Sequence, residues 1–569
     1  MTGLAAPWLA HYDEGVPASL APYPQRTLVD YLADAAGDRP QQAALLFKGA
    51  TLTYRELDRL SSACAAAFRS LGVRRGDRVA LLLPNCPQFL IAQFAAWKIG
   101  AIVAPLNPMY TEQELEGPLR EHGIETIVTL TRFYGRVKQV QPRTPLTRVI
   151  ATNIKDYFPP MLRLLFTLTR EKKGGDRVKL ERGDHDLSRL LTEHRAPSVQ
   201  TTPITTVTAD DDAVLLMSGG TTGTPKGVLG KHGAYVMAGL QEVAWLQSVL
   251  RPDTDVIMLP LPLFHVYGNV GVQSLALVNR NPLAIVPNPR DIADLIQTIR
   301  TVKPAFFNGV PTLFIALLNR TEVQHGKVDF KSIKICISGA AALMADTKNR
   351  FESATGARIV EGYSLTEAMM AACINPAKGP NKPGSVGMPL PDVHVRIFDG
   401  DQGVRVMPTG EIGELAVSGP QLMAGYWNRP DETAGILRDH DDETGTRQWV
   451  HTGDLGYLDE DGYVFIVDRK KDLIKTSGYQ VWPREIEEVL AGHPAVAEVG
   501  VAGVPDDVRG EAVKAWVVLR TGLTATDQEL RTFCREHLSP YKVPSHIEFR
   551  TELPKTMVGK VLRRALRES

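Results

Sequence analysis

The sequence has few cysteines, no net charge and no long apolar run, and each absence excludes a class of protein. The five cysteines form no CxxC pair, so we expect buried thiols in a reducing compartment rather than a metal cluster or disulfide framework. Lysine plus arginine equals aspartate plus glutamate, 64 against 64, and a chain without a global positive field has no general attraction for nucleic acid.

The beginning of the chain and its hydropathy indicate a cytoplasmic location. Residues 1–15 lack a basic segment followed by an apolar run, so we expect no signal peptide. No apolar stretch is long enough to cross a bilayer. A chain of 569 residues exceeds what one hydrophobic core holds, which predicts about two to four domains or subdomains. The sequence leaves the oligomeric state open.

Helical and strand patterns alternate through most of the chain. Apolar residues recur at helical spacing in Leu52–Leu71 and Gln88–Ile99, and continuous apolar runs at Val79–Leu83 and Ala101–Pro105 predict buried strands. Strand patterns recur at Asp255–Leu259, Leu283–Val286 and Ile333–Ile337. This alternation predicts an α/β fold with a largely parallel sheet.

The segment 155–183 interrupts this alternation. It combines apolar residues between Tyr157 and Phe166 with a basic cluster that includes Arg170, Lys172 and Lys173. Such a segment fits a helix resting on a membrane surface, with peripheral contact at the inner face of the membrane. A helix packed on its own domain fits equally well.

The C-terminal third changes character. From Gly387, short strands with Gly and Asp turns predict a smaller β subdomain, and Ile436–Gln448 reads as a polar surface loop. After 468–471, two helices and two strands form a compact α+β pattern of a size that folds alone. We therefore predict a large N-terminal domain over 1–468 and a small mobile C-terminal domain over 469–569.

A phosphate-binding loop is predicted at Met217–Gly227, which reads MSGGTTGTPKG after an apolar strand. Its glycines let the backbone approach an anion, its hydroxyls can donate hydrogen bonds, and Lys226 supplies a positive charge. The spacing GxxxxGK[ST] of a Walker loop is absent. The candidate nucleotide-binding residues here are Ser218, Gly219, Gly220, Thr221, Thr222, Gly223 and Lys226.

This loop is the first of several ordered motifs through which the chain resembles the acyl-adenylate-forming superfamily. The others are LPLFHVYG from Leu261, EGYSLTEA from Glu361, GEIGEL from Gly410, HTGDLG from His451, DRKKDLIKTSG from Asp468 and LPKTMVGK from Leu553. Within the superfamily the chain looks most like bacterial long-chain fatty-acid–CoA ligases. The implied fold has two α/β sheets layered with helices, a smaller β subdomain and a mobile α+β C-terminal domain.

The resemblance implies roles for residues around the nucleotide. Tyr363 would stack on adenine, Thr366 would reach the α-phosphate, and Glu367 would bind Mg²⁺, for which carboxylate oxygen is a suitable ligand. Asp454 and Arg469 would hold the ribose. The remaining implied nucleotide contacts are Gly339, Ala340, Ala341, Glu361 and Gly362.

Other implied roles concern the acyl group, coenzyme A and domain movement. Lys560 would bridge the carboxylate and the α-phosphate, and His265 would line the acyl site. Lys471 would be the pivot of a rotating small domain. The rotation would bring Ser477, Gly478 and Tyr479 beside the coenzyme A channel. Predicted acyl-pocket segments are Tyr235–Gly239, Val266–Val270, Asn308–Pro311 and Cys336–Ala340.

The predicted activity is ATP- and Mg²⁺-dependent conversion of a long-chain fatty acid to its acyl-adenylate, followed by transfer to coenzyme A. Two alternatives stay open at this point. One is a ligase for aromatic, cinnamate-like or other carboxylic acids, and the other is transfer of the acyl group to a carrier-protein thiol. The sequence does not fix the acyl chain length.

Overall fold

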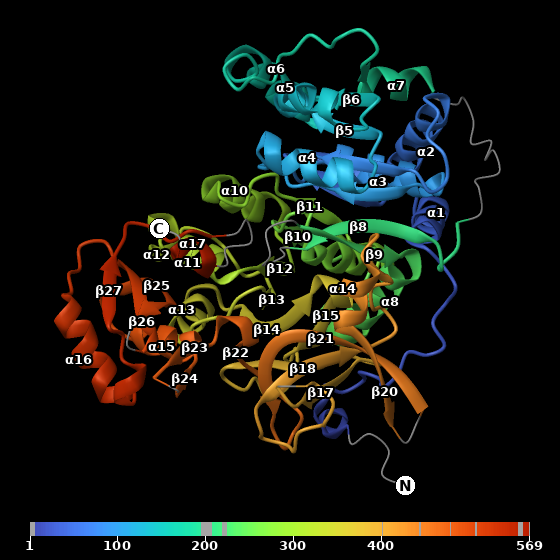
Figure 1. The fold of residues 1–569 in the computed structure, drawn as a ribbon. Helices are drawn as coiled ribbons and strands as arrows, with labels where there is room; N and C mark the ends of the chain where they lie inside the picture. Colours follow the sequence, from blue (N-terminus) through green and yellow to red (C-terminus); the bar gives the residue numbers. More distant parts are fainter. Residues whose placement is uncertain are drawn as a thin grey trace.

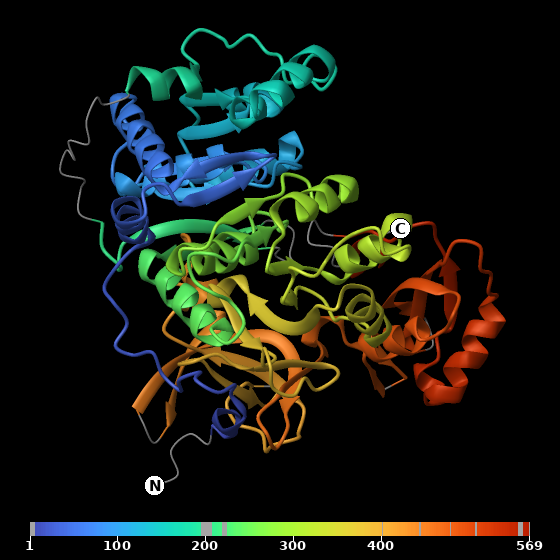
Figure 2. The ribbon, with the colours of Figure 1, turned by 180° about the vertical axis from the view of Figure 1, so that it is seen from behind.

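The computed structural model describes residues 6–194, 207–218, 225–400, 402–442, 445–477, 479–506, 509–555 and 561–567. Three sheets organise these residues (Figure 1). Most of the blue-to-cyan elements lie at one end, the yellow-to-orange strands lie at the other together with the dark-blue start of the chain, and the red C-terminal elements lie at the side. Figure 2 shows the same arrangement from behind. No described helix combines the length and hydropathy needed to span a membrane.

The first sheet has eight strands. In spatial order they are β19 (Gly425–Tyr426), β9 (Lys226–Lys231), β8 (Asp212–Ser218), β4 (Ile102–Pro105), β3 (Arg78–Leu82), β5 (Thr126–Leu130), β6 (Arg148–Thr152) and β7 (His185–Asp186). From β4 to β7 every pairing is parallel. The predicted strands at 79–83 and 101–105 are confirmed, and β4 is buried along its whole length, as expected for a parallel strand covered on both faces.

The second sheet has fourteen strands. Along its main path they are β17 (His394–Phe398), β18 (Gly413–Ser418), β21 (Gly445–Leu458), β22 (Val464–Arg469), β16 (Ser385–Pro389), β15 (Met370–Ile374), β14 (Arg358–Leu365), β13 (Ile335–Ser338), β12 (Phe306–Gly309), β10 (Ile257–Leu259), β11 (Leu283–Ile285), β1 (Ala43–Phe47) and β2 (Ala50–Thr53). Pairing is parallel on one side of β14 and antiparallel on the other. The predicted β subdomain is therefore continuous with the α/β sheet.

Helices cover these sheets and follow their sequence signals. They are α1 (Leu28–Asp38), α2 (Tyr54–Ser70), α3 (Pro87–Lys98), α4 (Glu112–Glu121), α5 (Thr131–Val140), α6 (Pro160–Thr169), α7 (Leu187–Glu193), α8 (His232–Leu246), α9 (Gln273–Val278), α10 (Ile292–Val302), α11 (Pro311–Leu318), α12 (Thr321–Gln324), α13 (Ala345–Thr355) and α14 (Pro430–Ile436). α2 begins where Thr53 and Glu56 form a capping box. α3 is buried on all sides, which explains why its sequence is apolar apart from Gln88, Gln93 and Lys98.

The third sheet belongs to the C-terminal region. Its strands are β24 (Tyr479–Val481), β23 (Ile474–Thr476), β26 (Gly510–Leu519) and β25 (Val496–Asp506), with β27 (His546–Phe549) beside β26. α15 (Pro483–Ala491), α16 (Asp527–His537) and α17 (Arg563–Arg567) accompany it. The second sheet ends along the chain with β22 at Arg469, and the third begins at Ile474. The domain boundary itself stays a prediction.

One predicted feature is wrong. Residues 437–442 and 445–448 are paired strands at the surface rather than a loop, because β20 (Leu437–Asp442) pairs with the beginning of β21. The polar sequence conceals this pairing. Phe398 stacks on His440 at 4.4 Å, and the His440 and His451 imidazoles lie 2.9 Å apart between their Nε2 atoms, so ring contacts hold strands that carry few aliphatic side chains.

Candidate active site

The centre of the candidate site is the end of β14, where three predicted residues meet. The Tyr363 hydroxyl donates to Asp454 Oδ2 at 2.6 Å, and Arg469 Nε lies 2.9 Å from Asp454 Oδ1. Asp454 and Arg469 face each other in the register of β21 and β22. Burial, reinforced by the Asp454 charge, raises the pKa of Tyr363 well above its ordinary value, so its hydroxyl stays a donor at neutral pH.

Tyr363 and Arg469 each contact one oxygen of the Asp454 carboxylate and so orient it from both sides. Asp454 is 6% exposed and its backbone N–H donates to Thr452 Oγ1, so the strand and its neighbours fix its position. A carboxylate can accept two hydrogen bonds from a vicinal diol, and Arg469 limits the cost of burying its charge. The geometry therefore fits recognition of a ribose.

The Glu361 carboxylate stabilises the neighbouring segment 339–343 through a hydrogen bond. Its Oε2 accepts from the Leu343 backbone N–H at 3.1 Å, and Gly339 N–H donates to Gly309 O at 3.2 Å. Burial raises the Glu361 pKa to about 7. Ala340 has φ +65°, and a side chain at Gly339 would stand 2.9 Å from the Tyr267 ring. The turn 339–341 is thus held in a conformation that exposes backbone beside Gly362 and Tyr363.

The phosphate side of the site contains a contact that the sequence did not predict. The Tyr426 hydroxyl donates to Glu367 Oε1 at 2.8 Å, and Lys226 Nζ lies 4.8 Å from the centre of the Tyr426 ring. Lys226 also forms an ion pair with Glu432. The sequence GYW around Tyr426 predicts only a strand and gives no sign that the tyrosine contacts Glu367.

Ser218 and Lys226 face each other where β8 and β9 begin to separate. Residues 219–224, which include Gly219, Gly220, Thr221, Thr222 and Gly223, lie outside the described residues. Thr366 begins the 3₁₀ turn Thr366–Ala368, directly before Glu367, and its carbonyl accepts from the Met369 N–H at 3.0 Å. This turn carries Thr366 and Glu367 side by side in the sequence, and Tyr426 links the Glu367 carboxylate to Lys226.

Glu367 suits a magnesium ion. Its Oε1 is held by Tyr426, while no hydrogen bond within the described part of the chain involves Oε2. A hard cation that takes most of its ligands from phosphates and water needs one or two such carboxylates. The described residues contain no cluster of three His, Cys, Asp or Glu side chains arranged to hold a metal. The residues present thus fit a cation brought with a phosphate substrate.

His265 is placed as a neutral group. Burial lowers its pKa to about 4, and its Nδ1 accepts from the Tyr267 backbone N–H at 3.3 Å. It follows the LPLF segment and precedes the π-helical turn η4 (Tyr267–Val272). At neutral pH it can line an acyl site without adding charge.

The predicted hinge residue, Lys471, lies close in the sequence to Asp468, whose carboxylate binds two arginines. Lys471 stands in the 3₁₀ turn Lys470–Asp472, two residues after Arg469. The Asp468 carboxylate accepts from the Arg484 N–H at 2.9 Å and from Arg563 Nη1 at 3.0 Å. These contacts connect β22 to α15 and α17.

Two of the predicted coenzyme A residues adjoin the strands of the third sheet, because Ser477 follows β23 and Tyr479 begins β24. Ser477 has φ +51°, and its N–H donates to Arg509 O at 2.9 Å. Tyr479 is 55% exposed and stacks on Tyr541 with ring centroids 4.5 Å apart. Gly478 and Lys560 lie outside the described residues, so their predicted roles stay predictions.

A small cavity lies behind the turn 339–341 and Tyr363. Tyr267, Asn308, Ile337 and Gly339 line it, which places three of the four predicted acyl-pocket segments on its wall. From α8, however, the residue on this wall is Glu242 and not a member of Tyr235–Gly239. The Tyr235 hydroxyl donates to Asn269 instead, at 2.5 Å. Glu242 lies seven residues after Tyr235, two helical turns along the same face, and this periodicity could have identified it.

The chain matches the AMP-binding enzyme family over residues 32–427 and the AMP-binding enzyme C-terminal domain over 485–560. It is 40% identical to a long-chain-fatty-acid–CoA ligase of Bacillus subtilis (strain 168) over 562 residues, covering 99% of this chain and 98% of that protein. Its identity to the long-chain-fatty-acid–CoA ligase of Salmonella typhimurium is 38%, with the same coverage of both chains.

Among solved structures, the anthranilate–CoA ligase AuaEII in complex with anthranoyl-AMP superposes with a TM-score of 0.81 at 26% identity, covering 97% of this chain and 98% of that chain. The match to the family extends over more than half of the sequence, and the order of the motifs is that of the superfamily. This protein therefore belongs to the AMP-binding enzyme family within the acyl-adenylate-forming superfamily, as the sequence motifs predicted.

Proposed function

We propose that the protein is an AMP-forming ligase that joins long-chain fatty acids to coenzyme A. The observation that carries the proposal is the line of groups around the end of β14. Asp454 and Arg469 suit a ribose, and Glu367 and Lys226 suit a phosphate–cation pair. Similarity to fatty-acid–CoA ligases over 99% of the chain supports the same reaction.

In the first half-reaction a carboxylate oxygen of the acid attacks the α-phosphorus of ATP, and pyrophosphate leaves. Thr366 would donate to an α-phosphate oxygen, and Lys560 would offset the charge of both anions as they meet. Glu367 would hold Mg²⁺, which supplies charge compensation for the outer phosphates. Tyr363 and the backbone at Gly339, Ala340 and Ala341 would enclose the adenine.

In the second half-reaction the coenzyme A thiolate attacks the acyl carbonyl, AMP leaves with the bonding electrons, and a thioester forms. Rotation of the C-terminal region about Lys471 would remove Lys560 and bring Ser477, Gly478 and Tyr479 to the pantetheine path. The AMP leaving group is already activated, so no strong base is required in the protein.

An assay of products separates this function from its alternatives. We expect palmitate, ATP, Mg²⁺ and coenzyme A to give equimolar palmitoyl-CoA, AMP and pyrophosphate, with coumarate a much poorer substrate. Preferential use of coumarate would support the aromatic-acid alternative. Activation without transfer to coenzyme A would support a carrier-protein acceptor and contradict the proposal.

We also propose that α6 contacts the surface of an anionic membrane. Its Met161, Leu164, Leu165 and Leu168 follow helical spacing and form one stripe, and they are 71%, 55%, 49% and 74% exposed. The neighbouring basic residues Arg163, Arg170, Lys172 and Lys173 suit lipid phosphates. An amphipathic helix usually directs its apolar face toward the protein core, whereas α6 directs its apolar stripe toward water.

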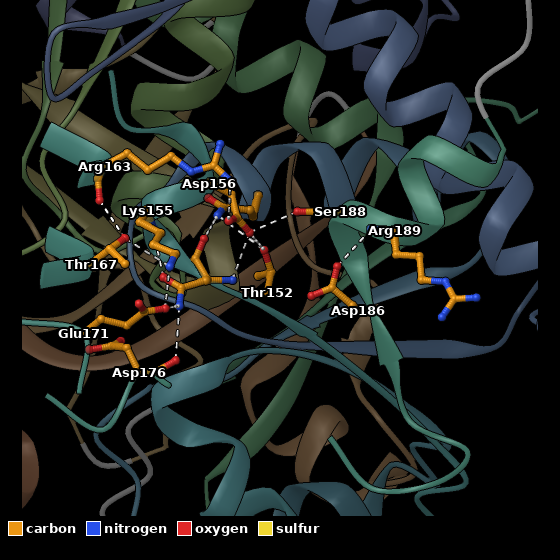
Figure 3. A network of polar contacts seen from close by, with 12 residues as sticks. Thr152, Lys155, Asp156, Arg163, Thr167, Glu171, Asp176, Asp186, Ser188 and Arg189 are labelled. Atoms are coloured by element: carbon orange, nitrogen blue, oxygen red, sulfur yellow. Dashed lines mark hydrogen bonds and ion pairs between the residues drawn. The ribbon is translucent and has the colours of Figure 1, made fainter. Parts of the chain in front are cut away.

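A polar network holds α6 in this orientation (Figure 3). Lys155 Nζ lies 2.5 Å from Glu171 Oε1 and 3.2 Å from Thr167 Oγ1. On the inner side of the helix, Phe166 packs edge-on against Phe158 at 5.5 Å between centroids. Contacts of this kind fix the inner face, so the apolar stripe stays directed outward.

Vesicle flotation tests the membrane contact. We expect the protein to float with vesicles of phosphatidylglycerol and phosphatidylcholine, less so at high salt, and Leu164→Asp with Leu168→Asp to reduce the bound fraction about tenfold or more. A matched control is Leu523→Asp, which changes an exposed leucine 49% accessible in the C-terminal region. Equal flotation of all variants, or self-association that only the α6 change abolishes, would contradict the proposal.

A further inference from the structure

The Lys226 ammonium, which the proposed function directs at phosphate, is paired with a carboxylate of the protein itself. Lys226 forms an ion pair with Glu432, the third residue of α14. The lysine side chain is 19% exposed and the glutamate side chain 38%, so an anion from solution can reach the pair. A protein anion thus occupies a position that suits a phosphate, and its presence there needs an explanation.

The fold holds the segment that contains Glu432 against the strand that begins at Lys226. β19 pairs antiparallel with β9, and Lys226 is the first residue of β9. The Thr433 hydroxyl accepts from the Tyr426 N–H at 2.9 Å and donates to Arg429 O at 2.8 Å, which fixes α14 beside β19. The position of Glu432 next to Lys226 therefore does not depend on their ion pair alone.

A second cation lets Glu432 release Lys226 without becoming unpaired. Arg429 Nη1 donates to Glu432 Oε1 at 2.6 Å, and Arg429 Nε donates to Glu121 Oε1 at 2.8 Å. Lys226 contacts the other carboxylate oxygen, Glu432 Oε2. When the lysine turns to another anion, Glu432 therefore keeps one charged partner. The flexible four-carbon stem of a lysine allows this turn while its backbone stays in β9.

This exchange lowers the affinity for phosphate. A phosphate that takes the Lys226 ammonium must displace Glu432, so its apparent affinity falls with the fraction of Lys226 that is paired. The effect applies to ligands with outer phosphates, namely ATP and pyrophosphate. AMP lacks those phosphates and does not compete with Glu432.

We propose that Glu432 is an exchangeable counter-anion for Lys226, which weakens binding of the outer phosphates and speeds the departure of pyrophosphate. This inference rests on the proposed function and deepens it, because it adds a residue to the phosphate side of the same site. Bound pyrophosphate can reverse the first half-reaction. A carboxylate that reclaims Lys226 from pyrophosphate therefore favours the forward direction.

Equilibrium binding tests the inference. Calorimetric titrations with ATP, pyrophosphate and AMP in the presence of Mg²⁺ compare the wild type with Glu432→Gln, which keeps the shape and removes the charge. We expect the variant to bind ATP and pyrophosphate about threefold or more tighter, within the range of one surface ion pair, and to bind AMP equally well. Equal AMP affinity also shows that the variant is folded.

The residue before Glu432 supplies a matched control. Asp431→Asn removes the same charge from an exposed position of α14 and should leave all three affinities unchanged. Tightening of the same size by this control would show that the net charge of the segment acts, and would contradict a specific role of Glu432. So would an equal change of the AMP affinity by Glu432→Gln.

The Lys226→Gln background assigns the effect to the lysine. Without the ammonium there is no charge for Glu432 to withhold, so Glu432→Gln should change the affinities for ATP and pyrophosphate much less than it does beside Lys226. This double-mutant cycle separates competition from repulsion through space. An equal effect of Glu432→Gln in both backgrounds would show repulsion and contradict competition for Lys226.

Release of pyrophosphate tests the consequence for turnover. In single-turnover runs with palmitate and ATP, we expect Glu432→Gln to slow this release about threefold, because tighter binding appears mainly in the dissociation rate. Unchanged release would contradict the proposed role in product departure.

The inference is overturned if Glu432→Gln leaves the affinities for ATP and pyrophosphate unchanged or weakens them. Weaker binding would mean that Glu432 positions Lys226 for the phosphates instead of competing with them. ATP binding by the wild type without an effect of the variant would contradict the inference alone. Absence of ATP binding by the wild type would contradict the proposed function as well.

Discussion

At the scale of single residues, the candidate site is organised by carboxylates in different surroundings. Asp454 is paired with Arg469 and Tyr363, Glu367 is held by one tyrosine hydroxyl, and Glu242 has no described partner. Their surroundings suit them for different tasks: a paired carboxylate binds hydroxyls, a half-satisfied one binds a cation, and an isolated buried one stays protonated. Each task has a separate test.

Glu367→Gln should impair turnover through magnesium. The amide keeps the shape and can still accept from Tyr426, but it lacks the charge that attracts the cation. We expect the Mg²⁺ concentration for half-maximal AMP formation to rise more than about tenfold, and Tyr426→Phe, which removes the orienting hydroxyl, to raise it by about tenfold. Titration of activity with Mg²⁺ measures both. An unchanged Mg²⁺ dependence with normal turnover would show that Glu367 is not a ligand.

Glu242 should make the protein less stable as the pH rises. Its folded-state pKa of about 8 lies above the ordinary value of 4.5, so the folded state binds the extra proton between these values. Stability is then lost as pH rises from about 4.5 to 8 and stays lost above. Glu242→Gln should therefore raise Tm over wild type by at least about 2 °C more at pH 9 than at pH 5. Calorimetry at both pH values measures the two Tm values. An equal Tm difference between variant and wild type at pH 5 and pH 9 would contradict a buried protonated Glu242.

At the scale of elements, the site depends on where pairing changes direction. β14 pairs parallel with β13 and antiparallel with β15, so its end opens toward both the α/β layer and the β subdomain. Ligands of parallel sheets bind beyond the carboxyl ends of the strands, and Glu361, Gly362 and Tyr363 occupy this end of β14. The next structural link is the segment from β22 to β23, which connects the site to the third sheet.

Lys471→Pro should trap the C-terminal region in one orientation. Lys471 is the second residue of the 3₁₀ turn Lys470–Asp472, and proline at this position fixes φ near roughly −65° and removes a backbone donor. We expect acyl-adenylate to form in a single turnover and its transfer to coenzyme A to slow at least about tenfold, because a hinge motion gates that step. Quenched single-turnover runs with labelled acid follow both steps. Lys471→Gly is the control and should leave both steps unimpaired. Equal slowing of both steps by proline would contradict the proposal that Lys471 is the pivot.

The sequence predicted regular elements well and side-chain environments poorly. The helix at 52–71 is α2, because an apolar face and a capping box agree, and the strand at Leu283–Val286 is β11. The pairing of β20 with β21 was missed because ring contacts stabilise it in place of an alternating apolar pattern. Glu242 and Tyr426 were missed because burial and partners depend on which elements meet. A glutamate on a helix reads as exposed until another element covers it.

At the scale of the whole molecule, three sheets contribute residues to the proposed reaction sequence. The eight-stranded sheet brings Ser218 and Lys226, the fourteen-stranded sheet brings Tyr363, Glu367, Asp454 and Arg469, and the third sheet brings Ser477 and Tyr479. The helix α6 lies near β6 and α5, at the end of the molecule opposite the yellow-to-orange strands (Figure 1).

The central claim is that the acid is activated as an acyl-adenylate. Palmitate labelled with ¹⁸O in its carboxylate tests this directly, because the attacking oxygen stays on the phosphorus when the thioester forms. We predict that mass spectrometry will find one labelled oxygen in each AMP and none in pyrophosphate. Label in inorganic phosphate together with ADP, or AMP without label, would contradict the account.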